Sequence, residues 1–388
     1  MTYTICHFSD LHLERSFARH GTASATARMR REGLRDALQA ICSLAQSRSC
    51  DALTIGGDLF DDESATVETG QFLTSLLGSL APMRVLIAPG NHDPYINGSL
   101  YMTMDWPSNV HIFTAPELHP IRLTDSLVLW GLAHPDHMWE GNPLAGPPIE
   151  PSKDTHLALF HGAERSWLAG IEGKGKHGPF TAADIQRKGF AGALSGHYHS
   201  YRLDTASGLL YPGTPEPLAV DETGDHGPVI VTVADSGEFT CELVPLQKWH
   251  ALQCTVDITA SSSLASLTAV VLAGIGDALG HRDPHRTVLQ LDLIGTLPTY
   301  MALDTDVLEQ SVHHELPLAA LTIRTRTQPA LDLDALAGEH TVRGRFVGAL
   351  RDAIDAKAAE DPEREMLERA LKYGLNALQG NEVLHREI

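Results

Sequence analysis

The chain has few cysteines and no long apolar run, and both shortages limit the class of protein that it can be. Its five cysteines, Cys6, Cys42, Cys50, Cys241 and Cys254, are widely spaced and form no C-x-x-C pair. This pattern excludes a disulfide framework and a thiolate zinc site, and it favours reduced thiols. No apolar stretch approaches the ~20 residues that cross a bilayer, and the first residues do not resemble a secretory signal. We therefore expect a soluble, cytoplasmic protein.

Basic residues are also in short supply. The sequence has 29 Lys and Arg against 49 Asp and Glu, which gives a net charge of −20 over 388 residues. Proteins that bind the phosphate backbone of nucleic acids usually present a basic face. Any such contact here must therefore come from local basic groups, from bound metal ions or from a partner.

The apolar fraction of 43% and the length allow one large catalytic domain and a smaller one. Strand-like segments at 2–8, 51–55 and 84–88 alternate with helical spacing at 26–48 and 67–80. This order predicts an α/β layered domain with partly parallel strands. Short strands follow, then a compact α+β unit and two tail helices. We predict domains at 1–247, 248–340 and 341–388.

Five polar motifs each begin where an expected strand stops. They are Ser9-Asp10-Leu11-His12, Gly56-Gly57-Asp58-Leu59-Phe60-Asp61, Gly90-Asn91-His92-Asp93, His161-Gly162 and Gly196-His197-Tyr198-His199. Ligand sites of α/β sheets form at the carboxyl ends of strands, so distant segments can converge there. Gly57 allows the sharp turn that points Asp58 into such a site. The motifs therefore predict one shared centre.

The side chains of these motifs offer carboxylate, imidazole and amide ligands but no thiolate. This mixture suits two divalent ions, with Mn²⁺ preferred and Fe, Zn²⁺ or Mg²⁺ as alternatives. Each motif alone is a weak signal, because a lone D-x-H or H-x-H is often a surface feature and a Gly-Asp is often a turn. All five in this order, each after a strand, favour a metal centre over chance.

The set resembles the calcineurin-like metallophosphoesterase superfamily. The resemblance implies a four-layer α-β-β-α sandwich with a smaller C-terminal α+β capping domain and a helical tail. It implies one metal held by Asp10, His12, Asp58 and His199, and a second held by Asp58, Asn91, His161 and His197, so that Asp58 bridges the ions. It also implies that His92 is a general acid rather than a ligand, and that Asp61 orients it.

Phosphodiester hydrolysis fits such a centre on chemical grounds. It needs an activated nucleophile and relief of charge on the phosphoryl oxygens, and a pair of metal ions can supply both. An imidazole with an ordinary pKa of ~6.5 can donate a proton to the leaving oxygen. The sequence therefore predicts a hydrolase that acts on phosphoester bonds.

Within this superfamily the chain resembles SbcD-type DNA repair exonucleases and their YhaO-like relatives. The resemblance rests on the residues after His12, on Phe60, and on the passage 211–218 with the sequence Tyr-Pro-Gly-Thr-Pro-Glu-Pro-Leu. It implies a Mn²⁺-dependent exonuclease or endonuclease that acts on single- or double-stranded DNA ends in repair. It also implies an SMC-like (SbcC-type) ABC ATPase as partner, docked on helices at 342–358 and 363–378. Candidate DNA contacts are Arg28, Arg31, Lys174 and Lys176, although charges on a helix usually form a solvated face.

Other interpretations stay open. The acidic charge favours a small-molecule phosphodiesterase, for example for cyclic nucleotides, or a phosphatase, whereas the long C-terminal addition counts against one. A third interpretation is a non-catalytic subunit that binds a partner, but the complete set of metal ligands argues against it. The tail helices have an equal claim to packing on their own cap. Relatives form dimers, but no homodimer interface can be recognised in this sequence. His134, His137, His177 and His226 are either groups that support the metal ligands or surface residues, and we expect them mainly at the surface.

Overall fold

The computed structural model describes residues 2–17, 24–168, 176–298, 301, 303–329, 333–358 and 361–378. Contacts divide the chain into two compact units, residues 1–254 with 274–291 and 309–323, and residues 255–273 with 292–308 and 324–388. The predicted three-part division stays a prediction. Among the helices of the described residues, none has the length and apolarity needed to cross a bilayer. The cytoplasmic location stays a prediction too.

The first unit contains a six-stranded sheet with the order β12-β11-β1-β2-β3-β4. Its strands are β1 (Thr2–Phe8), β2 (Ala52–Ile55), β3 (Arg84–Ile87), β4 (Val110–Ile112), β11 (Val229–Ala234) and β12 (Phe239–Leu243). Strands β1 to β4 are parallel, and β11 pairs antiparallel with β1. Helices α1 (Ser24–Ser47), α2 (Val67–Gly78) and α3 (Leu100–Thr103) connect the parallel strands. The predicted alternation of strands and helices is confirmed.

A second six-stranded sheet of the same unit has the order β5-β6-β7-β8-β10-β9. Its strands are β5 (His119–Arg122), β6 (Leu127–Gly131), β7 (Thr155–His161), β8 (Gly192–Gly196), β9 (Arg202–Asp204) and β10 (Leu209–Tyr211). The central strands β6, β7, β8 and β10 are parallel, and the two edge strands run antiparallel to them. The short helices η1 (Arg165–Leu168) and α4 (Ala182–Lys188) lie between β7 and β8 in the chain.

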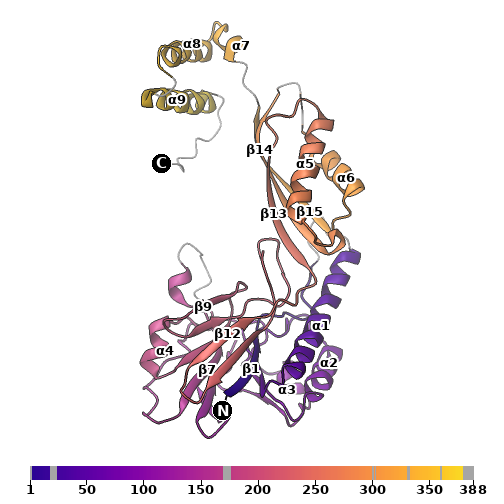
Figure 1. Cartoon of the computed structure of the whole chain (residues 1–388), viewed down its shortest axis with the longest axis vertical. Coiled ribbons are helices and arrows are strands. Elements are labelled where there is room, and N and C mark those ends of the chain that lie inside the picture. The colour runs from indigo at the N-terminus through magenta and orange to yellow at the C-terminus, as the bar shows by residue number, and fades with distance from the viewer. Residues whose placement is uncertain are drawn as a thin grey trace. The chain divides into compact units, whose positions relative to one another are not determined.

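Three apolar clusters define the layers of this unit. One contains Ile5, Leu159 and Leu194, from both sheets. A second joins α1 and α2 to the first sheet, and a third joins α4 to the second sheet. Full burial of one such aliphatic side chain contributes about 1.5–3 kcal/mol. The unit is therefore the predicted α-β-β-α sandwich, with α1 and α2 on one side and α4 on the other (Figure 1).

The C-terminal part of the chain begins with an α+β pattern, as predicted. It comprises β13 (His250–Asp257), α5 (Leu264–Leu279), η3 (Pro284–Arg286), β14 (Thr287–Leu297), α6 (Thr305–Glu315) and β15 (Ala320–Pro329). The three strands form one sheet with the order β13-β14-β15. The smaller α+β element of the fold prediction is thus present.

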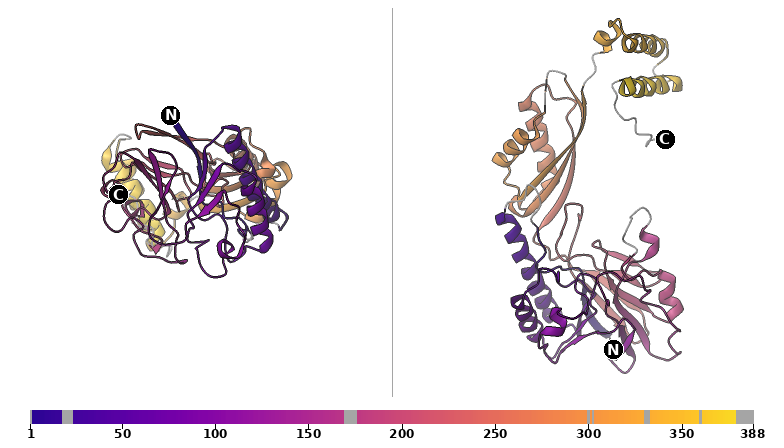
Figure 2. Two further views of the ribbon diagram at one scale, coloured as in Figure 1. Left: turned by 90° about the horizontal axis from the view of Figure 1, so that it is seen from below. Right: turned by 180° about the vertical axis from the view of Figure 1, so that it is seen from behind.

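The tail is helical, with α7 (Leu333–Ala337), α8 (Val342–Asp355) and α9 (Pro362–Leu378). Helices α8 and α9 lie side by side (Figures 1 and 2). Val347 and Ile354 of α8 form a buried cluster with Leu371 and Leu375 of α9. The two tail helices that the resemblance assigns to partner docking therefore pack on each other, because two amphipathic helices joined by a short connection bury their apolar faces together.

Candidate metal centre

All five motifs lie at the carboxyl ends of parallel strands. Three follow β1, β2 and β3 of the first sheet, and two follow β7 and β8 of the second. The strand ends of the two sheets meet closely, because Nδ1 of His161 is 2.9 Å from the carbonyl oxygen of Gly56. A Cβ on Gly196 would overlap that same oxygen. Glycine at this position therefore allows the two halves of the site to approach.

Several ligand candidates have a backbone conformation that is rare for residues other than glycine. The φ angles are 55° at Asp10, 51° at His12, 52° at Asp58 and 120° at His197. Each such residue costs of order 1–3 kcal/mol, and such strain concentrates at functional sites. Hydrogen bonds between the loops hold the conformation, with the N–H of Asp10 donating to Gly57 and the N–H of His12 donating to Asp58.

Gly57 has the sharp turn that the sequence predicts. Its φ is 94°, and an added Cβ would lie 2.6 Å from Nδ1 of His161. Any residue other than glycine would therefore have an unfavourable φ angle and a Cβ that clashes with His161. The turn brings Asp58 into the middle of the site.

The carboxylate of Asp58 lies between the two predicted ligand sets. Its Oδ2 is 3.6 Å from Nε2 of His12 and 3.4 Å from Nε2 of His161. Burial alone would raise the pKa of Asp58, but positive charge on His161 and His12 outweighs it and holds the pKa below its usual value. The carboxylate is therefore ionised, which is the form that binds metal.

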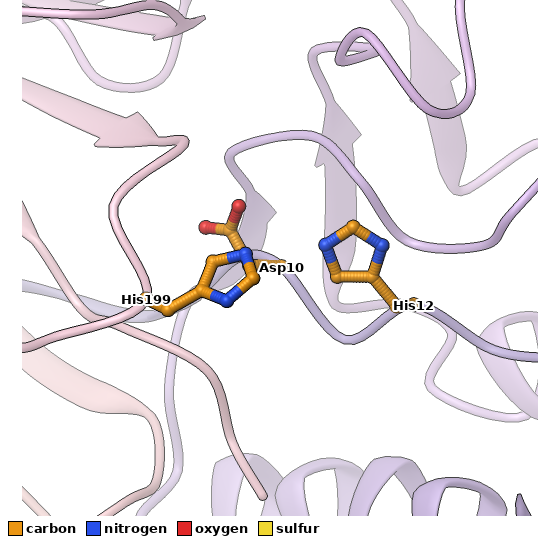
Figure 3. Close-up of side chains that lie close together, drawn as sticks. All are labelled: Asp10, His12 and His199. Atoms are coloured by element: carbon orange, nitrogen blue, oxygen red, sulfur yellow. The ribbon is translucent and has the colours of Figure 1, made fainter. Parts of the chain in front are cut away.

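The remaining ligand candidates surround Asp58. One group brings the ligand atoms of Asp10, His12 and His199 within 4.8 Å of one another (Figure 3). A second group joins Asp10, Asp58 and His161 within the same limit. Oδ1 of Asn91 lies 3.0 Å from Nε2 of His161. The structure thus brings six of the seven predicted ligands together.

His197, the seventh predicted ligand, joins the others from the loop after β8. Its ring lies 5.3 Å from that of His161, centroid to centroid, and its N–H donates to Asp10. Burial lowers the pKa of His197 well below its usual value, so the ring is neutral and able to bind metal.

Two buried imidazole nitrogens test whether metal ions fit this site. Nε2 of His12 and Nε2 of His197 have no hydrogen-bond partner among the described residues. A buried polar atom without a partner costs about 1–3 kcal/mol, and a divalent ion would remove that cost. The donor set of oxygens and imidazoles suits divalent ions of intermediate hardness. The residues therefore fit a dimetal site.

Carboxylates behind the imidazoles fix their orientation. Oδ1 of Asp61 lies 2.6 Å from Nδ1 of His12, and Oε1 of Glu222 lies 2.7 Å from Nδ1 of His199. Such carboxylates hold a metal-binding histidine in one tautomer and orientation. The sequence indicated Asp61 as a partner of His92, and the structure places Oδ1 of Asp61 3.5 Å from Nδ1 of His92. The shorter contact is the one to His12.

Sequence reasoning missed Glu222 and gave Asp93 no role. Glu222 follows no strand, and its only signal is an acidic side chain shortly after the Tyr211 passage. Asp93 is buried and accepts from the N–H groups of Asp58, Leu59 and Gly90 and from the hydroxyl of Tyr101. Burial, with the nearby charge of Asp58, raises the pKa of Asp93 to about 7. Asp93 therefore ties the loop after β2 to the loop after β3.

His92 lies at the edge of the centre rather than within it. Its side chain is 48% exposed, and its N–H donates to Oδ1 of Asp58 over 2.8 Å. It lines a cavity of about 460 Å³, together with Asp61, Asn91, His137 and others. Burial lowers the pKa of His92, and the charges of Asp58 and Asp61 offset this effect in part. This position suits a proton donor to a substrate in the cavity.

Two of the four additional histidines are buried, contrary to expectation. His134 and His226 are 0% and 5% exposed. Burial lowers the pKa of His134 to about 3. His226 is hydrogen-bonded to Thr214 and to the carbonyl oxygen of Glu222, so it supports the loop that carries Glu222. Both side chains are hydrogen-bonded to backbone carbonyl oxygens of loops, His134 to that of Asp136 and His226 to that of Glu222, as buried polar groups usually are.

The predicted DNA contacts lie in different settings. Arg28 is exposed, and its Nε lies 3.8 Å from Oε1 of Glu32. Arg31 is half-buried, and neither arginine lines the cavity beside His92. Lys176 is exposed and precedes a cavity residue, His177. Lys174 lies outside the described residues.

Two neighbouring arginines of the same helix have structural partners. Arg30 is buried, donates to the carbonyl oxygen of Pro217 and lies 3.9 Å from the ring centroid of Phe17. Arg35 pairs with Glu14 and Glu68. These two arginines of α1 therefore form contacts within the protein rather than a basic surface.

Comparisons with known proteins show the family of this chain. Residues 3–201 match the calcineurin-like phosphoesterase family. The chain is 26% identical over 311 residues to the uncharacterized metallophosphoesterase YhaO of Bacillus subtilis (strain 168), covering 77% of this chain and 73% of YhaO. A dimetal phosphatase from Danio rerio is similar in structure with a TM-score of 0.36 and 12% identity, over 59% of this chain and 92% of that one. The chain belongs to the calcineurin-like phosphoesterase family.

Proposed function

We propose that this phosphoesterase is a two-metal phosphodiesterase that cleaves DNA ends, with Mn²⁺ as its preferred metal. The observation that carries the phosphoester chemistry is the position of Asp58, whose Oδ2 lies within 3.6 Å of His12 and 3.4 Å of His161. One carboxylate between two histidines of different ligand sets is the arrangement that a bridged pair of ions requires.

The residues divide the work as follows. Asp10, His12, Asp58 and His199 would hold one ion, and Asp58, Asn91, His161 and His197 the other. Bound there, the ions would activate water as the nucleophile and neutralise charge on the phosphoryl oxygens. Asp61 and Glu222 keep two of the imidazoles in place. His92 donates a proton to the leaving oxygen from the wall of the cavity.

The choice of DNA is supported by the passage 211–218, which is typical of the nuclease branch. In the structure Glu216 of this passage accepts from the N–H groups of Lys248 and Trp249, directly before β13. The passage therefore fixes the chain where it leaves the sandwich. For the partner we propose an SMC-like ABC ATPase whose coiled coil binds the tail helices. Met366 and Tyr373 remain exposed on α9 for such a contact.

A small phosphoester is the second candidate, and one specific observation favours it. The cavity beside His92 is lined by three acidic side chains, Asp61, Asp62 and Glu63. Together with the net charge of −20, they oppose the approach of a polyanion.

Hydrolysis assays separate these candidates. Purified protein with Mn²⁺ is incubated with end-labelled single- and double-stranded DNA, with cyclic nucleotides and with bis(p-nitrophenyl) phosphate, and a chelator and Asp58→Ala serve as controls. Metal-dependent shortening of DNA supports the nuclease. If cyclic nucleotides are hydrolysed and DNA is not cleaved, even with the ATPase partner present, the protein is a small-molecule phosphodiesterase rather than a nuclease. No hydrolysis of any substrate would refute both.

A further inference from the structure

The cavity beside the metal centre carries one strongly basic side chain. Its described lining includes three carboxylates, from Asp61, Asp62 and Glu63, and the imidazoles of His92, His137 and His177. Arg15 is the one guanidinium or ammonium group among these described lining residues. A fixed positive charge next to a phosphoester site calls for an explanation in so acidic a protein.

The local backbone explains how Arg15 reaches the cavity. The loop after β1 has positive φ at three residues, the last two being His12 at 51° and Glu14 at 67°. The N–H of Arg15 donates to the carbonyl oxygen of His12 over 3.0 Å. Arg15 is therefore tied by a tight turn to a predicted metal ligand. Because Arg15 lies only three residues after that ligand, the turn keeps it at the edge of the centre.

The acidic neighbour of Arg15 in the chain is engaged elsewhere. Oε1 of Glu14 lies 2.6 Å from a guanidinium nitrogen of Arg35 and accepts from the hydroxyl of Thr69 over 3.1 Å. The carboxylate of Glu14 is thus taken by α1 and α2. Because of this turn, the side chains of Glu14 and Arg15 lie apart, and only that of Arg15 lines the cavity.

The guanidinium of Arg15 has no hydrogen bond or ion pair among the residues that the structure describes, although the side chain is half-buried. Even the acidic side chains that share its cavity form no pair with it in this part of the chain. A partly desolvated cation without a counter-ion is unfavourable in the free protein. A guanidinium presents a rigid fork of donors that matches phosphate oxygens.

We infer that Arg15 binds the anionic phosphoryl oxygens of the substrate in this cavity. The inference rests on the proposed phosphoester hydrolysis, and it adds a substrate-binding residue to the metal ligands and His92. It also helps to explain how an acidic protein with an acidic cavity accepts a phosphate anion, because a local cation beside the proposed ions offsets part of the repulsion.

Phosphate binding by the metal-loaded protein tests this role without any turnover. Inorganic phosphate is titrated calorimetrically into the Mn²⁺-loaded wild type, Arg15→Gln, Arg15→Lys and Arg48→Gln. Arg48 is a matched control, because it is an exposed arginine directly after α1 that pairs with Glu242 and does not line the cavity. Loss of a charge-assisted contact should weaken phosphate binding by about 10-fold or more in Arg15→Gln.

The pattern across the variants distinguishes binding from a structural role. Arg15→Lys keeps the charge but loses the fork, so an intermediate affinity is expected, and Arg48→Gln should match the wild type. Metal content and the unfolding midpoint should be unchanged in all variants. Equal phosphate affinity in the wild type and in both Arg15 variants would overturn the inference, as would a metal-loaded wild type that binds no phosphate.

Hydrolysis of bis(p-nitrophenyl) phosphate separates this inference from the proposed function. With Arg15→Gln we expect a raised KM in proportion to the lost phosphate affinity. A wild type that binds phosphate through Arg15 but hydrolyses no phosphoester would refute the function and keep the binding role. Normal hydrolysis with an unchanged KM and unchanged phosphate affinity in Arg15→Gln would refute the binding role alone.

Discussion

Glu222 holds the imidazole of His199 from behind, with 2.7 Å between Oε1 and Nδ1. Burial lowers the pKa of His199, but the hydrogen bond and charge of Glu222 raise it more, so that the pKa lies above its usual value. The second oxygen of Glu222 accepts from the N–H of Leu218 over 2.7 Å. The hydrogen bond to Leu218 therefore holds the carboxylate in the position from which it orients the histidine.

Glu222→Gln should lower metal affinity, because the amide weakens the hydrogen bond that orients His199. Loss of such a supporting carboxylate typically costs about 10–100-fold in metal affinity or activity. Titration of the apoprotein with Mn²⁺ measures the effect. Glu242→Gln is the control, since Glu242 is exposed and pairs only with Arg48 among the described ion pairs. Unchanged affinity at both sites would show that Glu222 does not support a ligand.

Asp58→Ala should remove both ions, because its carboxylate lies between His12 and His161. Metal analysis of the purified variant tests this, and Asp62→Ala, which removes an acidic side chain from the cavity but no predicted ligand, should keep both ions. The bridging role would be wrong if Asp58→Ala still carried two ions per chain.

His92→Ala should keep the metals but lower kcat by about 10²–10⁴-fold, the usual contribution of a general acid. The loss should be largest for substrates with poor leaving groups. It should be small for p-nitrophenyl esters, because p-nitrophenolate leaves without a proton. Comparing kcat for the two kinds of substrate, with metal content as control, measures this. An equal loss with both would assign His92 to binding rather than to proton transfer.

Glu216 should make the unfolding free energy depend on pH. Burial raises its pKa from the ordinary 4.5 to about 7, against the lowering effect of the Lys248 and Trp249 N–H groups. Between these values the folded chain holds a proton that the unfolded chain releases, so stability should fall as pH rises from about 4.5 to about 7.

Urea unfolding of the metal-free protein at pH 5 and pH 8 measures this change, and Glu216→Gln, which cannot ionise, isolates the contribution of Glu216. The variant should lose less stability than the wild type between the two pH values. An identical pH dependence in both proteins would contradict the prediction.

The candidate metal ligands can be recognised in the sequence because their signals are local. A short apolar strand, often a glycine such as Gly57, and then a ligand is a pattern of a few neighbouring residues. The carboxyl ends of parallel strands meet at one edge by the rules of sheet topology. The residue pattern therefore predicted an α/β layered domain and the convergence of the five motifs, whereas the four-layer sandwich and the roles of individual ligands came from the family resemblance.

Tertiary structure alone decided which side chains support that centre. His12 meets Asp61 49 residues away, and His199 meets Glu222 across a loop with no regular spacing. Charges on a helix usually form a solvated face, yet Arg30 of α1 is buried. Arg15, which precedes that helix, lines the cavity. Periodicity reports which face of an element is apolar, but charged and polar pairs depend on how distant elements are packed. The sequence therefore determined where the chemistry is, and the packing determined what holds it in place.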